Sequence, residues 1–156
     1  MPRIGKDLVW RSDQYGHVPD DAVEAGPGVY VGRMEQSGDL IPGKIVPDND
    51  KGYVAYGGKE WEHDEYEVLC TTNARGSKRC YTWVHDSDGH VPDNAIEAGQ
   101  SDSGDTLYIA RTKINNETVV GKVHDGLDFG YFPYGGKEVE RNRYEVLAWR
   151  EDDDDD

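Results

Sequence analysis

The stretch YGGKE occurs twice in this chain, at residues 56–60 and again at residues 134–138. Each copy precedes the tetrapeptide YEVL, at residues 66–69 and 144–147. Adjacent glycines supply the positive φ values that a tight turn needs, so each copy predicts a hairpin turn that carries one lysine and one glutamate. The recurrence of the same turn raises the question of how much of the flanking sequence is also duplicated.

The duplication extends over nearly the whole chain. WRSDQYGHVPDDAVEAG at residues 10–26 matches WVHDSDGHVPDNAIEAG at residues 83–99 without a gap. The second copy then has the longer loop QSDSGDT where the first has PG. After this loop VYVGR matches LYIAR, and PGK ending at Lys44 matches VGK ending at Lys122. The chain is therefore a tandem repeat, which has to be recognised before any fold is assigned.

The repeated segments have the pattern of β-strands. VYVGR and LYIAR are rich in β-branched and aromatic residues, and clusters of Gly, Pro, Asp and Asn bound each segment. PDDAVEAG and PDNAIEAG would make a helix of barely two turns, so we interpret them as irregular turns. We predict an all-β fold of two tandem antiparallel β repeats, related by a pseudo-twofold axis and packed into one compact unit through Trp10 and Trp83.

The limits of the matching segments predict the domain organisation. A repeat of about 70 residues is too small to be robust alone, so we expect the two repeats to share a core. The predicted divisions are a first repeat at residues 7–70, a linker or hairpin at 71–80, a second repeat at 81–150 and an acidic tail at 151–156.

The formal net charge of -15 argues against a polyanionic partner and excludes nucleic acid. The tail at 152–156 is most simply a solvated acidic end, with calcium or mineral binding as the alternative. No run of about 18 apolar residues occurs, so we expect no membrane insertion. The N-terminal segment MPRIGKDLVW lacks the apolar run of a secretory signal, and we expect a cytoplasmic protein or release by a non-classical route.

The cysteines and histidines do not predict a metal site. Cys70 and Cys80 bracket the loop TTNARGSKR, and a disulfide between them is geometrically conceivable. In a reducing compartment two free thiols are the favoured interpretation. No Cys or His set has the spacing of zinc ligands, so we expect no metal and no other cofactor.

The order W…G…VPDNAI…G…LYIAR…PGK…GGKE…YEVL resembles the DM9 repeat family, from Trp10 to Leu147. This family includes mannose-specific lectins of bivalve molluscs and parts of some natterin-like pore-forming proteins. The resemblance implies β-rich repeats, a sugar site associated with a repeat, and often a homodimer. It also implies that the sugar is held by the GK lysine, here Lys44 and Lys122, and by an acid in the loop before the LYIAR strand, here Asp102.

Sugar hydroxyls both donate and accept hydrogen bonds, so a good site combines ammonium groups with carboxylates. The alternative is that these charges form ordinary surface ion pairs, worth under about 1 kcal/mol each. The candidate sets are Lys44 with Asp39 or Glu60, and Lys122 with Glu117, Glu138 or Asp102.

The repeated aspartates of the VPD motif and the repeated arginines at the strand ends could have structural roles instead of binding a sugar. Asp20 and Asp93 follow Pro in VPD and are candidates for sugar binding, although Asp at such a place more often caps the following turn. Arg33 and Arg111 end their strand segments, and we expect them to tie the repeats together rather than to contact a ligand.

We therefore predict a non-catalytic lectin of the innate-immunity type that binds mannose or mannose-containing glycans. Two linked weak sites would gain avidity on multivalent glycans. The alternative is a structural or natterin-like pore-forming accessory module that binds a protein or membrane partner. An enzyme is disfavoured, because Glu60 and Glu138 occupy equivalent positions in two repeats and not complementary positions at one site.

Overall fold

The computed structural model describes residues 7–72 and 80–150; the predicted acidic tail and most of the predicted linker lie outside the described residues. Within these ranges one 3-10 turn, η1 (Pro47–Asn49), accompanies the strands. The strands before residue 73 are β1 (Leu8–Gln14), β2 (Glu24–Gly26), β3 (Val29–Gln36), β4 (Asp39–Val46), β5 (Lys51–Tyr56), β6 (Lys59–His63) and β7 (Glu65–Thr71). Those after residue 79 are β8 (Tyr81–Ser87), β9 (Glu97–Gln100), β10 (Thr106–Ile114), β11 (Glu117–Val123), β12 (Gly130–Tyr134), β13 (Lys137–Arg141) and β14 (Arg143–Trp149).

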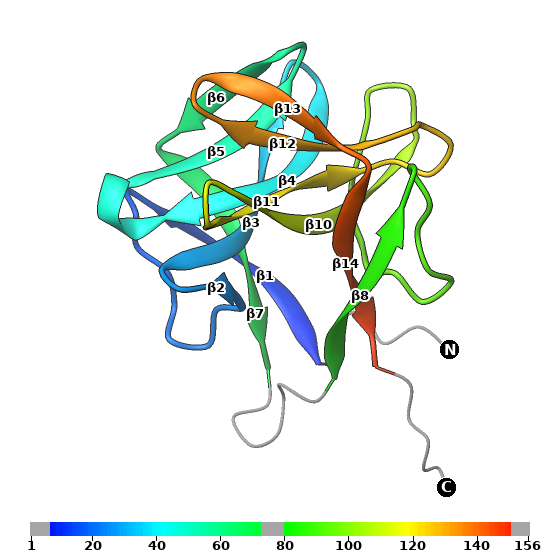
Figure 1. Cartoon of the computed structure of the whole chain (residues 1–156). Coiled ribbons are helices and arrows are strands. Elements are labelled where there is room, and N and C mark those ends of the chain that lie inside the picture. The colour runs from blue at the N-terminus through cyan, green and yellow to red at the C-terminus, as the bar shows by residue number, and fades with distance from the viewer. Residues whose placement is uncertain (1–6, 73–79, 151–156) are drawn as a thin grey trace, which may run out of the picture.

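The second half of the sheet repeats the first half in reverse. The strand order β1-β7-β3-β4-β5-β6 continues as β13-β12-β11-β10-β14-β8, with antiparallel pairing throughout. The halves meet where Lys59 of β6 pairs with Lys137 of β13, at one end of the molecule (Figure 1). A pseudo-twofold axis therefore passes between these two strands, and the predicted all-β fold of two antiparallel repeats is confirmed.

The sheet closes into a barrel through β9. This strand pairs with β10 and also, at Leu40 and Gln100, with β4 of the other repeat. The ring β4-β5-β6-β13-β12-β11-β10-β9 is thereby complete. A Cβ atom at Gly99 would lie 2.0 Å from the carbonyl oxygen of Leu40, so this closure requires a glycine.

The segments interpreted as irregular turns are turns that lead into β2 and β9. The Ala22 N–H donates to the Pro19 carbonyl at 3.1 Å, and the Ala95 N–H donates to the Pro92 carbonyl at the same distance. The rest of each segment is then extended enough to pair with the following strand.

The core consists of three clusters of buried side chains. Met34, Ile41 and Val54 belong to a cluster drawn mainly from the first repeat, and Phe132 and Val146 to one from the second. The third cluster joins side chains from both repeats, and Trp10 and Trp83 pack against it. The prediction that the repeats share a core through these tryptophans is confirmed.

Two buried tyrosines connect the YEVL strands to the GHVP turns. The phenol of Tyr66 donates a hydrogen bond to the carbonyl of His17 at 2.8 Å, and that of Tyr144 to the carbonyl of His90 at 2.9 Å. Burial raises the pKa of each phenol to about 12. The YEVL and GHVP motifs recur together because one supplies the donor and the other the acceptor of this hydrogen bond in each repeat.

Gly99→Ala should lower the free energy of unfolding by about 4 kcal/mol, because its Cβ would clash with backbone that cannot shift without opening the β4–β9 contact. Urea denaturation measures the loss. Gly104→Ala is the control: Gly104 has a φ of +91° but open space around its Cβ position, so only backbone strain of about 1 to 2 kcal/mol is expected. Equal losses in the two variants would contradict the steric argument.

The two buried phenols should make the fold sensitive to alkali. Below pH 10 they are neutral in both the folded and the unfolded chain, whereas between pH 10 and 12 they ionise only on unfolding. The free energy of unfolding should therefore fall across this window. The double variant Tyr66→Phe/Tyr144→Phe should flatten this fall in urea denaturation at graded pH, while Tyr15→Phe, which changes an exposed tyrosine, should not. A wild-type slope in the double variant would refute the assignment.

Candidate functional site

The first lysine cluster consists of Lys44, Tyr53, Glu60 and Tyr134. Lys44 pairs with Tyr53 across β4 and β5, and the preceding Gly43 allows the strands to approach, since a Cβ there would lie 2.1 Å from the Tyr53 carbonyl oxygen. The Lys44 ammonium lies 3.3 Å from Oε2 of Glu60. It also lies 5.2 Å and 5.3 Å from the ring centroids of Tyr53 and Tyr134. The lysine is thus enclosed by one carboxylate and two aromatic rings.

The second lysine cluster consists of Lys122, Tyr131, Glu138 and Tyr56, at the equivalent positions. The Lys122 ammonium lies 3.4 Å from Oε2 of Glu138, and 6.0 Å and 5.7 Å from the ring centroids of Tyr131 and Tyr56. It differs from the first cluster in one bond, because the ammonium also donates to the Ala55 carbonyl at 2.8 Å.

Each cluster is completed by a tyrosine from the other repeat. Tyr134 belongs to the second YGGKE but contacts Lys44, and Tyr56 belongs to the first YGGKE but contacts Lys122. None of the four tyrosines of the two clusters was among the site residues predicted from the sequence. The signal that could have found Tyr53 and Tyr131 is the repeated GY dipeptide that lies eight to nine residues after each GK lysine.

The two YGGKE segments bind each other, and we call this contact the YGGKE clasp (residues 56–60 and 134–138). Oε1 of Glu60 accepts a hydrogen bond from the N–H of Gly136 at 2.8 Å, and Oε1 of Glu138 accepts one from the N–H of Gly58 at 2.8 Å. Backbone bonds of 3.1 Å run from the Glu60 N–H to the Gly136 carbonyl and from the Glu138 N–H to the Gly58 carbonyl. Each glutamate therefore joins its own lysine to the turn of the other repeat.

The charged side chains of the two clusters are largely buried. The side chains of Lys44 and Glu60 are each 11% exposed, and those of Lys122 and Glu138 are each 13% exposed. They do not resemble exposed hairpin-end charges, for which a contribution below about 1 kcal/mol would be expected. Burial raises the pKa of Tyr53 and of Tyr131, so both phenols remain protonated at neutral pH and can donate.

The other acids proposed for the lysine sets lie elsewhere. Asp39 begins β4 and Glu117 begins β11, each about 17 Å along its strand from the lysine at the rise of an extended chain. Asp102 lies against the turn at Gly38, and its N–H donates to Oδ1 of Asp39 at 2.8 Å. The structure thus joins Asp39 to Asp102 across the two repeats, and brings Glu60 and Glu138 alone of the proposed acids into ion pairs with the lysines.

Asp20 and Asp93 lie exposed in the two turns that precede β2 and β9. Neither carboxylate forms a capping bond or an ion pair with any residue that the structure describes. The ion pairs of Lys44 and Lys122 do not include them. The expected capping role is therefore not seen, because the turns are closed by backbone bonds alone.

Arg33 and Arg111 tie the repeats together, as predicted. Arg33 donates to the carbonyl of Ala98 in the second repeat at 3.1 Å, and Arg111 donates to the carbonyl of Ala25 in the first at 2.8 Å. Each guanidinium also lies 4.2 Å from the ring centroid of a tryptophan in its own repeat, Trp10 and Trp83 respectively.

The two cysteines belong to the hydrophobic core clusters. Cys70 and Cys80 are buried and neither is in a disulfide, and burial raises the pKa of the Cys70 thiol to about 12. In residues 7–72 and 80–150, no group of three or more His, Cys, Asp or Glu side chains is arranged to hold a metal ion. The same ranges contain no helix long and apolar enough to cross a membrane.

Comparison with known proteins finds a matching family model, a protein of similar sequence and a protein of similar fold. The model of the DM9 repeat matches residues 26–141. Natterin-4 from Thalassophryne nattereri is 28% identical over 139 residues, which cover 85% of this chain and 32% of Natterin-4. The nematode sperm cell motility protein MFP2B has a similar structure, with a TM-score of 0.67 and 15% identity over 93% of this chain and 44% of that one. The chain spans about a third of Natterin-4, and the likeness to MFP2B concerns the fold alone.

Glu60→Ala should lower the free energy of unfolding by about 3 kcal/mol, because it leaves the Lys44 ammonium without its carboxylate and the Gly136 N–H without its acceptor. Glu60→Gln keeps an acceptor and should lose about half as much in urea denaturation. Glu62→Ala, at an exposed glutamate on the same strand, is the control and should stay within about 0.5 kcal/mol of wild type. A Glu60→Ala variant as stable as the control would contradict a stabilising clasp.

Proposed function

The chain belongs to the DM9 repeat family, and we propose that it is a non-catalytic lectin that recognises mannose or mannose-containing glycans. The observation that carries this proposal is the lysine cluster, in which an ammonium, a carboxylate and two tyrosines meet. The cluster occurs twice, at equivalent positions of the two repeats.

The composition of each cluster suits a sugar with vicinal hydroxyls. An ammonium has three N–H donors, and its ion pair with the glutamate occupies only part of them. Each carboxylate oxygen keeps a second lone pair beside the bond it already accepts. The phenols of Tyr53 and Tyr134 add hydroxyls that both donate and accept, next to apolar rings that favour the C–H face of a hexose.

The two clusters should differ in affinity. The Lys122 ammonium gives one N–H to Ala55, whereas in the described part of the chain the Lys44 ammonium has its ion pair with Glu60 and no such backbone acceptor. More donors therefore remain for a ligand at Lys44. We assign the stronger sugar site to the first cluster, although the longer loop with Asp102 belongs to the second repeat.

The same geometry supports binding over catalysis. Glu60 and Glu138 are equivalent, and each uses both oxygens to hold its lysine and the opposite turn. Such acids lack the complementary acid and base roles that glycoside hydrolysis requires. Affinity at one site should be weak, about millimolar to micromolar, and presentation of two sites, or four in a homodimer, would raise avidity on multivalent glycans.

The alternative proposal is a structural or pore-forming accessory module that binds a protein or membrane partner. The likeness to Natterin-4 favours it, because this chain corresponds to a part of that longer protein. Under this alternative the clasp would only hold the repeats together, and no free glycan would bind.

Calorimetry on the best mannose-type hit of a glycan array tests the lectin proposal. Lys44→Ala should weaken binding at the stronger site by tenfold or more, because it removes the donor that faces the sugar. Tyr134→Ala should weaken the same site although the residue lies in the other repeat. Lys51→Ala removes a lysine of β5 that pairs with Asp64 instead, and should bind as wild type does.

Circular dichroism on each variant separates loss of binding from loss of fold. If no glycan binds the intact protein above background, or if Lys44→Ala and Lys51→Ala bind a mannose glycan equally well, the lectin proposal fails and the accessory-module alternative takes its place.

A further inference from the structure

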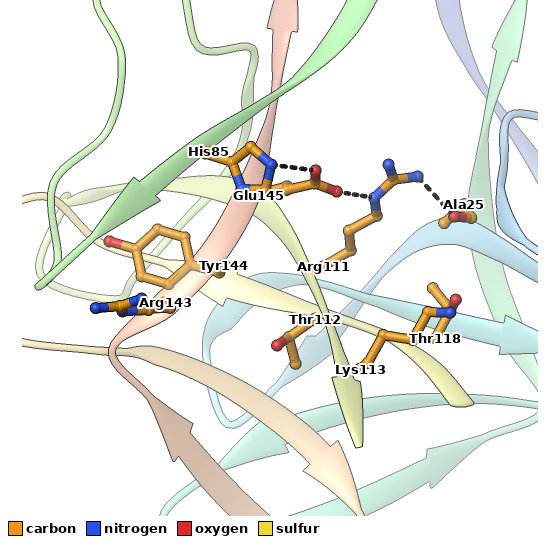
Figure 2. A pocket seen from close by; sticks show the side chains of 9 residues that line it. All are labelled: Ala25, His85, Arg111, Thr112, Lys113, Thr118, Arg143, Tyr144 and Glu145. Carbon is orange, nitrogen blue, oxygen red and sulfur yellow. Dashed lines mark hydrogen bonds and ion pairs between the residues drawn. The ribbon is translucent and has the colours of Figure 1, made fainter. Parts of the chain in front are cut away.

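The two repeats differ in charge on one face of the barrel. In the second repeat a cavity of about 630 Å³ opens beside β10 and β14 and is lined by the cations Arg111, Lys113 and Arg143. Among the described residues of this lining Glu145 is the one acid, and Thr112 and Thr118 add hydroxyls beside His85 and Tyr144 (Figure 2). A cation-lined cavity is unexpected in a chain whose formal net charge is -15.

The one acid of the cavity is already neutralised. Oε1 of Glu145 lies 2.7 Å from Nε of Arg111, and Oε2 lies 3.2 Å from Nε2 of His85. Figure 2 shows this chain of contacts running from His85 through Glu145 and Arg111 to Ala25 along one side of the cavity. In the described part of the chain, Lys113 and Arg143 have no carboxylate partner, so their charge faces the cavity uncompensated.

The two cations reach the cavity from different strands. Arg111 of β10 pairs with Glu145 of β14 in antiparallel register. The two strands separate beyond this pair, and Lys113 and Arg143 lie on opposite sides of the cavity (Figure 2). An anion in the cavity would be attracted by both charges.

The fold does not require cations at these positions. The equivalent residues of the first repeat are Glu35, two residues after Arg33, and Glu65, directly before the tyrosine of YEVL. The same two positions therefore carry two acids in one repeat and two bases in the other. Since the scaffold accepts either sign, the cations of the second repeat need an explanation outside the packing of the barrel.

We propose that this cavity of the second repeat binds a small molecule that carries a carboxylate or a sulfate and is about the size of a mono- or disaccharide. Lys113 and Arg143 attract the anionic group to the cavity from opposite sides, and the side chain nearer to it donates charge-assisted hydrogen bonds. Thr112 and Thr118 serve the neutral hydroxyls of the same molecule, and the volume lies within the range of small-molecule pockets. The site is separate from both lysine clusters and does not rest on the mannose proposal.

Titration with inorganic sulfate, glucuronate and glucose at low ionic strength tests this site. We expect one equivalent of sulfate or glucuronate to bind, with chemical-shift changes at the amides of residues 111–113 and 143–145, and no binding of uncharged glucose there. Stronger binding of glucuronate would identify the carboxylate of a sugar as the ligand group, and stronger binding of sulfate would identify a sulfate ester.

Lys113→Glu and Arg143→Glu should each weaken anion binding by tenfold or more. Both variants should fold, because the first repeat has glutamate at the same positions. Arg150→Glu makes the same charge change at an exposed arginine that does not line the cavity, and should bind anions as wild type does. Lys44→Ala should also retain anion binding, which distinguishes this site from the sugar site proposed above.

Three results would overturn the proposal. The first is that neither anion binds the wild-type protein. The second is that Lys113→Glu binds anions as tightly as Arg150→Glu does. The third is that the protein self-associates without binding either anion and that Lys113→Glu abolishes this association. That result would mean that this cationic face binds the equivalent acidic face of a second copy of the chain.

Discussion

The structure depends on how the carboxylates of Glu60 and Glu138 are satisfied. A carboxylate that is withdrawn from water needs an opposite charge and hydrogen-bond donors close to it. Glu60 obtains the charge from Lys44 of its own repeat and a donor from Gly136 of the other. Neither repeat alone supplies both partners, so the two lysine clusters exist only in the assembled pair.

The same pseudo-twofold arrangement places two like charges next to each other at the axis. Any residue on a pseudo-twofold axis must face its own copy, and here Lys59 faces Lys137 across β6 and β13. Like charges at such a position repel, and a duplicated sequence cannot avoid the encounter without breaking the repeat. Part of the repulsion is relieved because the Lys59 ammonium lies 5.9 Å from the ring of Trp61. The clasp on either side of this pair supplies the attraction that holds the junction.

Much of the architecture could be predicted from the sequence, because it depends on local patterns that occur twice. The strands, the turns at the paired glycines and the role of Arg33 and Arg111 follow from alternation and repetition. The site could be predicted only in part. The pairing of Lys44 with Glu60 was among the proposed sets, but the contribution of Tyr134 to the same site was not foreseen. Contacts between repeats depend on the symmetry axis, and no spacing within one repeat encodes where that axis lies.

The internal comparison of the two repeats separates what the barrel needs from what it only tolerates. The GK glycines Gly43 and Gly121, the clasp glutamates and the cross-repeat arginines are the same in both copies, since each takes part in a contact that the other copy mirrors. Two positions near the arginines carry Glu35 and Glu65 in one copy and Lys113 and Arg143 in the other. The side chains at these positions take part in none of the contacts between repeats described above, so the charge at each position can differ between the two copies. A duplicated fold can therefore keep one pair of equivalent sites at its axis while its outer faces acquire different binding properties.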